Sequence, residues 1–423
     1  MSLSLRNRDL ASLVVVGTVV GFGFASVYIA RQEVVNSASL SYGLFFLGLY
    51  VAAHVIARIT VPDADPYLLP MAGLLTGIGL TEIYRLDEND AFRQGLWIVI
   101  GLAAFAATLF LLKDDFRRLE SYKYLFGLGA IGLLLLPAVP VLGRTVNGAR
   151  LWIHVGSIQV QPGELAKICL ILFLAGYLRE KREVLAQLRL KDLGPLFLIW
   201  GCAMLVLVVT NDLGGALLYF GIFLAMLYVA TAQAWFVLAG GALFVGGAAA
   251  LYTVIPRVKE RVQIWLDPWD DPFGQGYQAI QSLYSIANGG FGGTGFGQGT
   301  YTDADGHRLI PSLNTDFIYS ALAQELGLVG ICGFLLVYML FAARGFRISL
   351  LAQDGFSKLL AVGLTFAFTL QAFLIIGGII RIVPLTGITL PLVSYGGSSI
   401  VANFVLLALL LLVSNRANEG LQR

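Results

Sequence analysis

Residues 194–231 read GPLFLIWGCAMLVLVVTNDLGGALLYFGIFLAMLYVAT, two apolar runs that are parted only by Asn211 and Asp212. A helix needs about 20 apolar residues to cross a bilayer, and slightly shorter runs also suffice. Two spans with so short a link form a tight hairpin. Asp212 is typical of a residue that caps the start of the second helix. This stretch therefore predicts a membrane protein built of helices.

The composition of the whole chain agrees with that prediction. Of its 423 residues 57% are hydrophobic and 13% are charged, and the mean hydropathy is +0.79. Soluble proteins carry about 25% charged residues. The net charge of +2 gives no reason to expect a nucleic-acid partner. Cys169, Cys202 and Cys332 lie in apolar runs and are interpreted as buried hydrophobes, not as disulfides or metal ligands.

Hydropathy predicts an all-α polytopic fold with about twelve transmembrane helices. The predicted spans are 11–30, 41–60, 66–84, 94–112, 123–142, 163–178, 194–210, 213–231, 235–255, 317–343, 359–379 and 395–414. The first run is interpreted as a span, since no clear cleavage site for a signal peptide follows it. Lys and Arg are enriched in the segments on the N-terminal side of the membrane, so both termini are predicted to be cytoplasmic. The one long loop, 256–316, then faces outward.

The loop contains DPFGQGYQAIQSLYSIANGGFGGTGFGQGT at 271–300. Its GFGGTG matches the dinucleotide-binding pattern, but it follows a helical stretch rather than a strand, which argues against a nucleotide site. The preceding residues predict a short amphipathic helix over 277–287, with a start near Pro272 and a stop at 288–290. Two interpretations remain open: a mobile lid over a groove, or a structural helix at the lipid interface.

Three aspartates, Asp267, Asp270 and Asp271, crowd the stretch LDPWDDP. Like charges this close raise one another's pKa, and an aspartate with a raised pKa is a candidate general base. Asp before Pro also caps turns and helices, and composition alone does not choose between these roles.

Glu164 and Lys167 lie three residues apart in QPGELAKICLILFLAGYL and share a helix face. A charge at the bilayer centre costs about 2.5 to 3.5 kcal/mol on insertion scales, so such a pair is a candidate functional site. A structural pair between helices is the alternative. Polar clusters at 147–167, 267–285, 312–316 and 384–399 all map to the predicted outer side.

With these clusters in place, four motifs resemble those of the SEDS family (shape, elongation, division and sporulation), which has RodA-like and FtsW-like members. The motifs are NGAR-WI followed by QPGELAK, then LDPWDDPFGQGYQAIQS, NTDFIYSALAQELGLVG and LPLVSYGGSS. The resemblance covers about residues 66–414. It implies a ten-helix core, residues 63–423, after a two-helix N-terminal extension, residues 1–62.

The resemblance implies a peptidoglycan glycosyltransferase. Such an enzyme polymerises lipid II into β-1,4 glycan strands at the outer face of the bacterial cytoplasmic membrane, in cell elongation or division. A class B penicillin-binding protein is the implied partner, and membrane lipid surrounds both. Asp271 matches the family's essential aspartate, while Glu164 and Lys167 match residues that line its cavity.

The predicted catalytic residue is therefore Asp271, as a general base. The predicted substrate-binding residues are Glu164, Lys167, Arg150, Gln278, Gln281, Asp316, Ser394 and Ser398. Lys167, Arg150 and Arg381 are the candidate cations for the leaving pyrophosphate. No all-protein metal site is predicted, so a divalent cation, Mg²⁺ or Mn²⁺, would be held by the substrate pyrophosphate.

The chain departs from the family pattern at three motifs. Gly163 stands for a serine, Asn314 stands for a histidine, and the motif around Asp212 lacks its proline. Two other functions stay open. One is a lipid II flippase or transporter, although no convincing internal repeat is visible. The other is a non-catalytic scaffold for a penicillin-binding protein, which would not need an acidic centre such as Asp271.

Overall fold

A computed structural model describes residues 2–30, 37–140, 142–146, 149–156, 158–186, 190–302 and 308–422. Two residues of the NGAR motif, Asn147 and Gly148, lie outside the described residues.

The chain is a bundle of long helices. In the described part of the chain these are α1 (Ser2–Ala30), α2 (Ser37–Thr60), α3 (Leu68–Leu86), α4 (Glu88–Leu112), α6 (Lys123–Leu135), α7 (Pro162–Ala186), α8 (Leu190–Val209), α9 (Leu213–Thr231), α10 (Ala234–Val254), α13 (Ile318–Leu351), α14 (Gly355–Ile379) and α15 (Gly397–Gln422). Each of the twelve predicted spans falls on one of them. Eight described helices are long and apolar enough to cross a membrane, and α6 and α8 are shorter apolar helices. The polytopic helical fold is confirmed.

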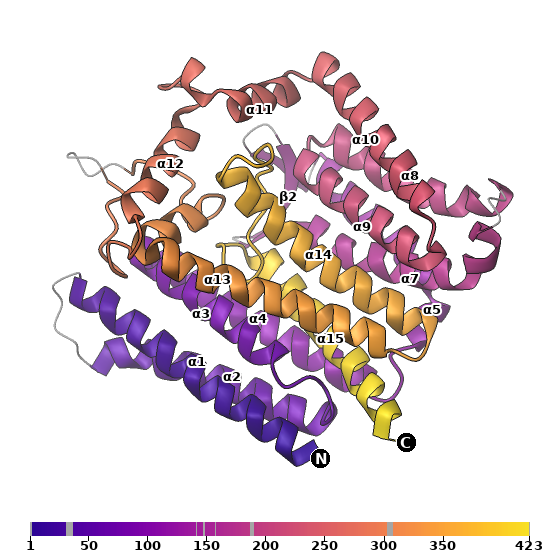
Figure 1. Ribbon diagram of the computed structural model, residues 1–423, viewed down its shortest axis with the longest axis horizontal. Helices are drawn as coiled ribbons and strands as arrows, with labels where there is room; N and C mark the ends of the chain where they lie inside the picture. Colours follow the sequence, from indigo (N-terminus) through magenta and orange to yellow (C-terminus); the bar gives the residue numbers. More distant parts are fainter. Residues whose placement is uncertain are drawn as a thin grey trace.

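Figure 1 shows both termini at one end of the bundle, which we call the terminal end. The opposite end, which we call the loop end, carries α11 (Pro256–Leu266), α12 (Tyr277–Gly289) and the strand β2 (Ala149–Val155). An even number of crossings brings the two termini to the same end.

Helices α14 and α15 form the centre of the bundle. Most residues of their apolar segments are buried, whereas α10 is almost entirely exposed on its apolar surface. Helix α15 packs against α4, and α14 packs against α7, α9 and α13. Aspartate side chains cap several helices: Asp87 accepts from Asn89 N in α4, and Asp354 accepts from Ser357 N in α14. Asp212 caps α9, as predicted, by accepting from Gly215 N at 2.8 Å.

One predicted span is shorter than expected. Helix α6 ends at Leu135, not near residue 142, and continues as the short helix η1 (Leu136–Ala138). Pro137 in η1 lacks the amide that a longer α-helix would need. A three-stranded antiparallel sheet of β1 (Gly143–Val146), β2 and β3 (Ile158–Val160) follows, in the order β1-β2-β3. The sheet leads directly into α7.

The long loop also contains regular structure. The helix α11 is followed by the short helix η2 (Pro268–Asp270), a turn, and α12. The predicted helix over 277–287 is confirmed, since α12 begins at Tyr277. Only the role of Pro272 as its start is wrong, because residues 271–276 form a turn in which Gly276 N donates to Asp271 O at 3.0 Å. The helix ends at Gly289, as predicted. Its buried face consists of small residues and one isoleucine: Ile280, Ser282, Ser285 and Gly289.

Candidate functional site

The predicted charge pair forms at the loop end of α7. Lys167 Nζ donates to Glu164 Oε2 at 2.8 Å, and the residues are only 2% and 8% exposed. The helix places both side chains on one face because they are three residues apart. Tyr219 of α9 closes over the same turn, since its hydroxyl donates to Gly163 O at 2.7 Å.

A polar chain continues from this pair into the centre of the bundle. Lys167 Nζ also donates to Gln371 Oε1 of α14 at 2.6 Å. Gln371 Nε2 in turn donates to Thr389 O at 2.9 Å, and the Thr389 hydroxyl donates to Ser399 Oγ at 2.8 Å. Gln371 is fully buried. This series of hydrogen bonds therefore connects the ion pair to the irregular segment between α14 and α15.

A second charged group surrounds Arg261 of α11. Its guanidinium Nη1 donates to Thr386 O at 2.9 Å, and it attracts both Asp212 and Asp316. Burial raises the pKa of Asp316 to about 6, and the positive charge of Arg261 opposes that rise. Burial also raises the pKa of Asp212, and Glu164 adds to it, while the bond from Gly215 opposes it. Arg261 thus links the long loop to the acidic residues that precede α9 and α13.

Asp271 is exposed, and its carboxylate is held in a fixed orientation. Its Oδ1 accepts from Gly274 N at 3.1 Å and its Oδ2 accepts from Gln275 N at 3.0 Å. A carboxylate has about four acceptor sites, so these two bonds leave room for a further proton donor. The neighbouring Asp270 is also exposed, whereas Asp267 caps η2 by accepting from Trp269 N.

Arg381, in the segment between α14 and α15, holds the aspartate-rich stretch in place. Its guanidinium donates to Trp265 O at 2.9 Å and to Leu266 O at 2.7 Å, and it lies over the Trp269 ring. Trp265 Nε1 donates back to Arg381 O at 3.0 Å. These contacts commit Nε and Nη2 of Arg381 to the loop, so the arginine positions the segment that precedes Asp271.

Two predicted substrate-binding serines make bonds within the protein. Ser394 Oγ donates to Thr315 O at 2.6 Å, and Ser398 Oγ accepts from Gln161 N at 2.8 Å. The first bond joins the segment before α15 to the residue beside Asp316, and the second joins α15 to the residue before α7. Both serines therefore hold together the backbone around the two charged groups.

The remaining predicted residues are half-buried and come from different elements. Arg150 lies on β2, where Nη2 donates to Val139 O at 3.2 Å, and its buried Nε has no partner among the described residues. Gln278 and Gln281 lie on the first turns of α12. Glu164 and Lys167 are thus in direct contact, and Gln371 and Thr389 connect them to the start of α15. Asp271 and α12 belong to the long loop at the same end of the bundle.

Within the described residues, no three His, Cys, Asp or Glu side chains gather into a group able to hold a metal ion. The described side chains therefore do not fit an all-protein metal site.

Sequence reasoning missed two residues, Gln371 and Arg261. Gln371 is a polar residue in the middle of an apolar helix, which is itself a signal of a buried polar contact. Arg261 carried no such signal, because α11 is a charged loop helix in which one basic residue resembles the next.

Known proteins match this chain over most of its length. A family model for cell cycle proteins of the FtsW/RodA/SpoVE type matches residues 68–419. The "Peptidoglycan glycosyltransferase RodA" of Mycobacterium tuberculosis is 39% identical over 99% of this chain and 92% of its own length. "Stage V sporulation protein E" of Bacillus subtilis is 33% identical over 83% of this chain and 96% of its own.

A solved structure agrees with the sequence relatives. A chain of a peptidoglycan synthase complex, described as coordinating polymerization and crosslinking, has a TM-score of 0.70 and 31% identity. The match covers 84% of this chain and 98% of that one. The motifs, the helical bundle and these matches agree, and the chain belongs to the FtsW/RodA/SpoVE family of multi-pass membrane proteins.

Proposed function

We propose that this chain is a peptidoglycan glycosyltransferase that polymerises lipid II into β-1,4 glycan strands. The observation that carries the proposal is the exposed carboxylate of Asp271, which two backbone amides orient in the loop at the same end of the bundle as the buried pair of Glu164 and Lys167. Relatives that match nearly the whole chain carry the name peptidoglycan glycosyltransferase. The loop end of the bundle faces outward, and both termini are cytoplasmic.

In the proposed reaction Asp271 removes the proton from the 4-hydroxyl of the acceptor sugar. The freed oxygen attacks the anomeric carbon of the donor, the bond from that carbon to the pyrophosphate oxygen breaks, and lipid pyrophosphate leaves with the electron pair. Attack from the opposite face converts an α-linked donor into a β-1,4 link. The two backbone amides that donate to the carboxylate fix its orientation before the acceptor sugar binds.

The leaving pyrophosphate needs positive charge. Lys167 is the first candidate, because an ammonium has three donors and Lys167 forms two bonds with the described residues, to Glu164 and Gln371. Arg150 is the second, because its buried Nε has no partner among the described residues. A divalent cation, Mg²⁺ or Mn²⁺, carried by the substrate pyrophosphate would add to both.

A class B penicillin-binding protein is the proposed partner that crosslinks the product. A related chain has been solved in a peptidoglycan synthase complex, which supports such an assembly. The polyprenyl tail of lipid II would remain in the membrane lipid around the bundle, which explains why the proposed reaction centre lies at a bundle end.

The test is glycan polymerisation by the purified protein with its cognate penicillin-binding protein. Transpeptidation is blocked, labelled lipid II is added, and the products are separated on a gel. Asp271→Asn is compared with Asp270→Asn, a matched control on the adjacent exposed aspartate. We expect a ladder from the wild type and from the control, and a loss of about 100-fold or more in Asp271→Asn, as for removal of a general base.

A ladder that persists in Asp271→Asn would remove Asp271 from catalysis. If no ladder forms under any metal or lipid condition, the glycosyltransferase proposal fails, and the flippase and scaffold functions become the alternatives.

A further inference from the structure

Helix α13 is interrupted close to its start, and the glycine-rich turn 290–299 fills the interruption. Gly327, in the first third of α13, has a positive φ of 64° and interrupts the helix. Thr294 N donates to Gln324 O at 3.0 Å and Gly295 N donates to Glu325 O at 3.1 Å, while Leu328 N donates to Gly290 O at 3.0 Å. The turn therefore supplies partners for backbone groups that the break leaves open.

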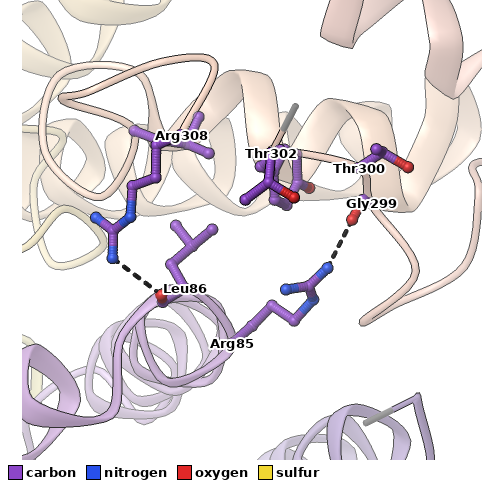
Figure 2. A pocket seen from close by; sticks show the side chains of 8 residues that line it. Arg85, Leu86, Gly299, Thr300, Thr302 and Arg308 are labelled. Atoms are coloured by element: carbon purple, nitrogen blue, oxygen red, sulfur yellow. Dashed lines mark hydrogen bonds between the residues drawn. The ribbon is translucent and has the colours of Figure 1, made fainter. Parts of the chain in front are cut away.

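A buried glutamate and an arginine hold the far half of the turn. Glu325 is 1% exposed, and its carboxylate accepts from Gly297 N at 2.7 Å and from Gly299 N at 3.1 Å. Arg85 of α3 donates to the carbonyls of the same two glycines, at 2.9 and 2.6 Å, and Figure 2 shows it reaching Gly299. The N–H group and the carbonyl oxygen of both Gly297 and Gly299 are thus hydrogen-bonded.

The first helix of the chain contacts the same turn from outside. Ser26 Oγ of α1 donates to Phe296 O at 2.8 Å. A Cβ built on Gly23 would lie 3.4 Å from the Phe296 ring and 3.5 Å from the Thr81 side chain of α3, and a Cβ built on Gly297 would lie 2.9 Å from Cβ of Ala30. Small residues on both sides let the α1 backbone and the turn approach closely.

Helix α1 is itself fixed at this end. The Phe24 ring lies 5.7 Å from that of Tyr84 on α3, and the Tyr28 ring lies 5.6 Å from it. Tyr42 of α2 joins the same aromatic cluster, with its ring 5.4 Å from Tyr84. The contact with the turn is therefore made by a packed helix end. Both α1 and α2 precede residue 68, where the family match begins.

The glycine-rich turn directly follows α12 in the sequence. Gly289 ends α12 against α13, where a Cβ would lie 2.3 Å from Ala323 O, and Ser282 Oγ bonds to Ser320 Oγ at 2.5 Å. Both α12 and the turn are attached to the short first segment of α13 before its break. A shift of the turn would therefore shift the end of α12.

We propose that helix α1 is a brace for the long loop: through Ser26 and Gly23 it presses the glycine-rich turn onto α13 and so positions α12. Ser26 and Gly23 are positioning residues, since neither touches a proposed substrate-binding group. The role of the brace in catalysis rests on the proposed function, because it acts through α12 with Gln278 and Gln281. The contact itself does not rest on it.

The test uses the full-length protein in lipid nanodiscs, with Gly23→Leu and Gly21→Leu as a matched pair. A Cβ on Gly21 meets nothing within 4 Å, so the control makes the same change on the same helix without touching Phe296. Leucine favours helix over glycine, so α1 is expected to fold in both variants. Amide hydrogen exchange of 290–299 and the initial rate of lipid II polymerisation are measured.

We expect Gly23→Leu to speed exchange in the turn by about fivefold to a hundredfold, the range that overpacking of about 1–3 kcal/mol produces. Exchange in α14 and the profile of Gly21→Leu should stay unchanged, and the polymerisation rate should fall in Gly23→Leu alone. Ser26→Ala should speed exchange by about fivefold, as the loss of one hydrogen bond does, and Ser26→Thr should restore it.

Unchanged exchange in both Gly23→Leu and Ser26→Ala would overturn the brace. Faster exchange with an unchanged polymerisation rate would overturn its role in positioning α12. If the wild type makes no glycan, the proposed function fails, and the exchange comparison still decides whether α1 holds the turn.

Discussion

The carboxyl group of Asp316 shows how burial at the loop end changes a single residue. Its pKa is raised from 3.8 to about 6 by burial, against the attraction of Arg261. Between these two values the folded chain binds more protons than the unfolded chain, so the contribution to stability is full below about pH 4 and is lost as pH rises through about 6. The difference amounts to about 3 kcal/mol.

Asp316→Asn should remove this pH dependence. The variant cannot ionise, so it should gain stability relative to the wild type as pH rises from 4 to 7, by up to about 3 kcal/mol. The measurement is thermal unfolding in detergent across this pH range, as the difference between the two proteins. Parallel curves would mean that Asp316 ionises in the folded state as it does in water.

Glu164 and Lys167, at the same end of the bundle, form a buried ion pair. Glu164 and Lys167 are more buried than Asp316, but they form an ion pair at 2.8 Å, and Lys167 has Gln371 as a further partner. A buried pair costs desolvation that only good geometry and further hydrogen bonds repay. Such a pair is weak evidence for stability, and its place at the loop end fits a role in binding better.

At the scale of elements, α12 packs on α13 through its small residues. Gly289→Ala would place a Cβ 2.3 Å from Ala323 O, so α12 must move or α13 must distort, at a cost of about 1–3 kcal/mol. Gly292→Ala is the control, because its Cβ meets nothing within 4 Å. We expect limited proteolysis to cut within α12 faster in Gly289→Ala only. Equal cutting in both variants would show that this contact does not hold α12 in place.

The sequence predicted the elements better than their contacts. The twelve apolar runs are strong local signals, and each falls on a helix, although α6 is shorter than its run. The Glu164–Lys167 pair could be predicted because both residues lie on one helix turn. The wrong role predicted for Pro272 arose because proline is a common first helix residue, whereas here Asp271 forms a turn with Gly274 and Gln275. The partners of Arg381 and Glu325 could not be predicted, because they are carbonyls and amides of distant loops.

At the scale of the whole molecule, the terminal end and the loop end of the bundle have different surfaces. The terminal end carries partly exposed ion pairs such as Arg179 with Glu120 and Lys123 with Glu180. Such pairs contribute little to stability. The excess of basic residues at this end predicts that it faces the cytoplasm. The loop end carries exposed aromatic residues, among them Phe273 at 91% exposure. The proposed function needs the loop end to face outward, because lipid II is polymerised there.

This orientation predicts which residues a membrane-impermeant maleimide reaches in intact cells. In a background without Cys169, Cys202 and Cys332, Phe273→Cys at the loop end should be labelled before lysis. Arg118→Cys at the terminal end, whose side chain is 79% exposed in the native chain, should be labelled only after lysis. The reverse pattern would place Asp271 on the cytoplasmic side, away from the substrate, and the glycosyltransferase proposal would fail whatever the geometry of its site. Labelling of both before lysis would mean that the membrane is leaky, and Arg118→Cys serves as the control for this.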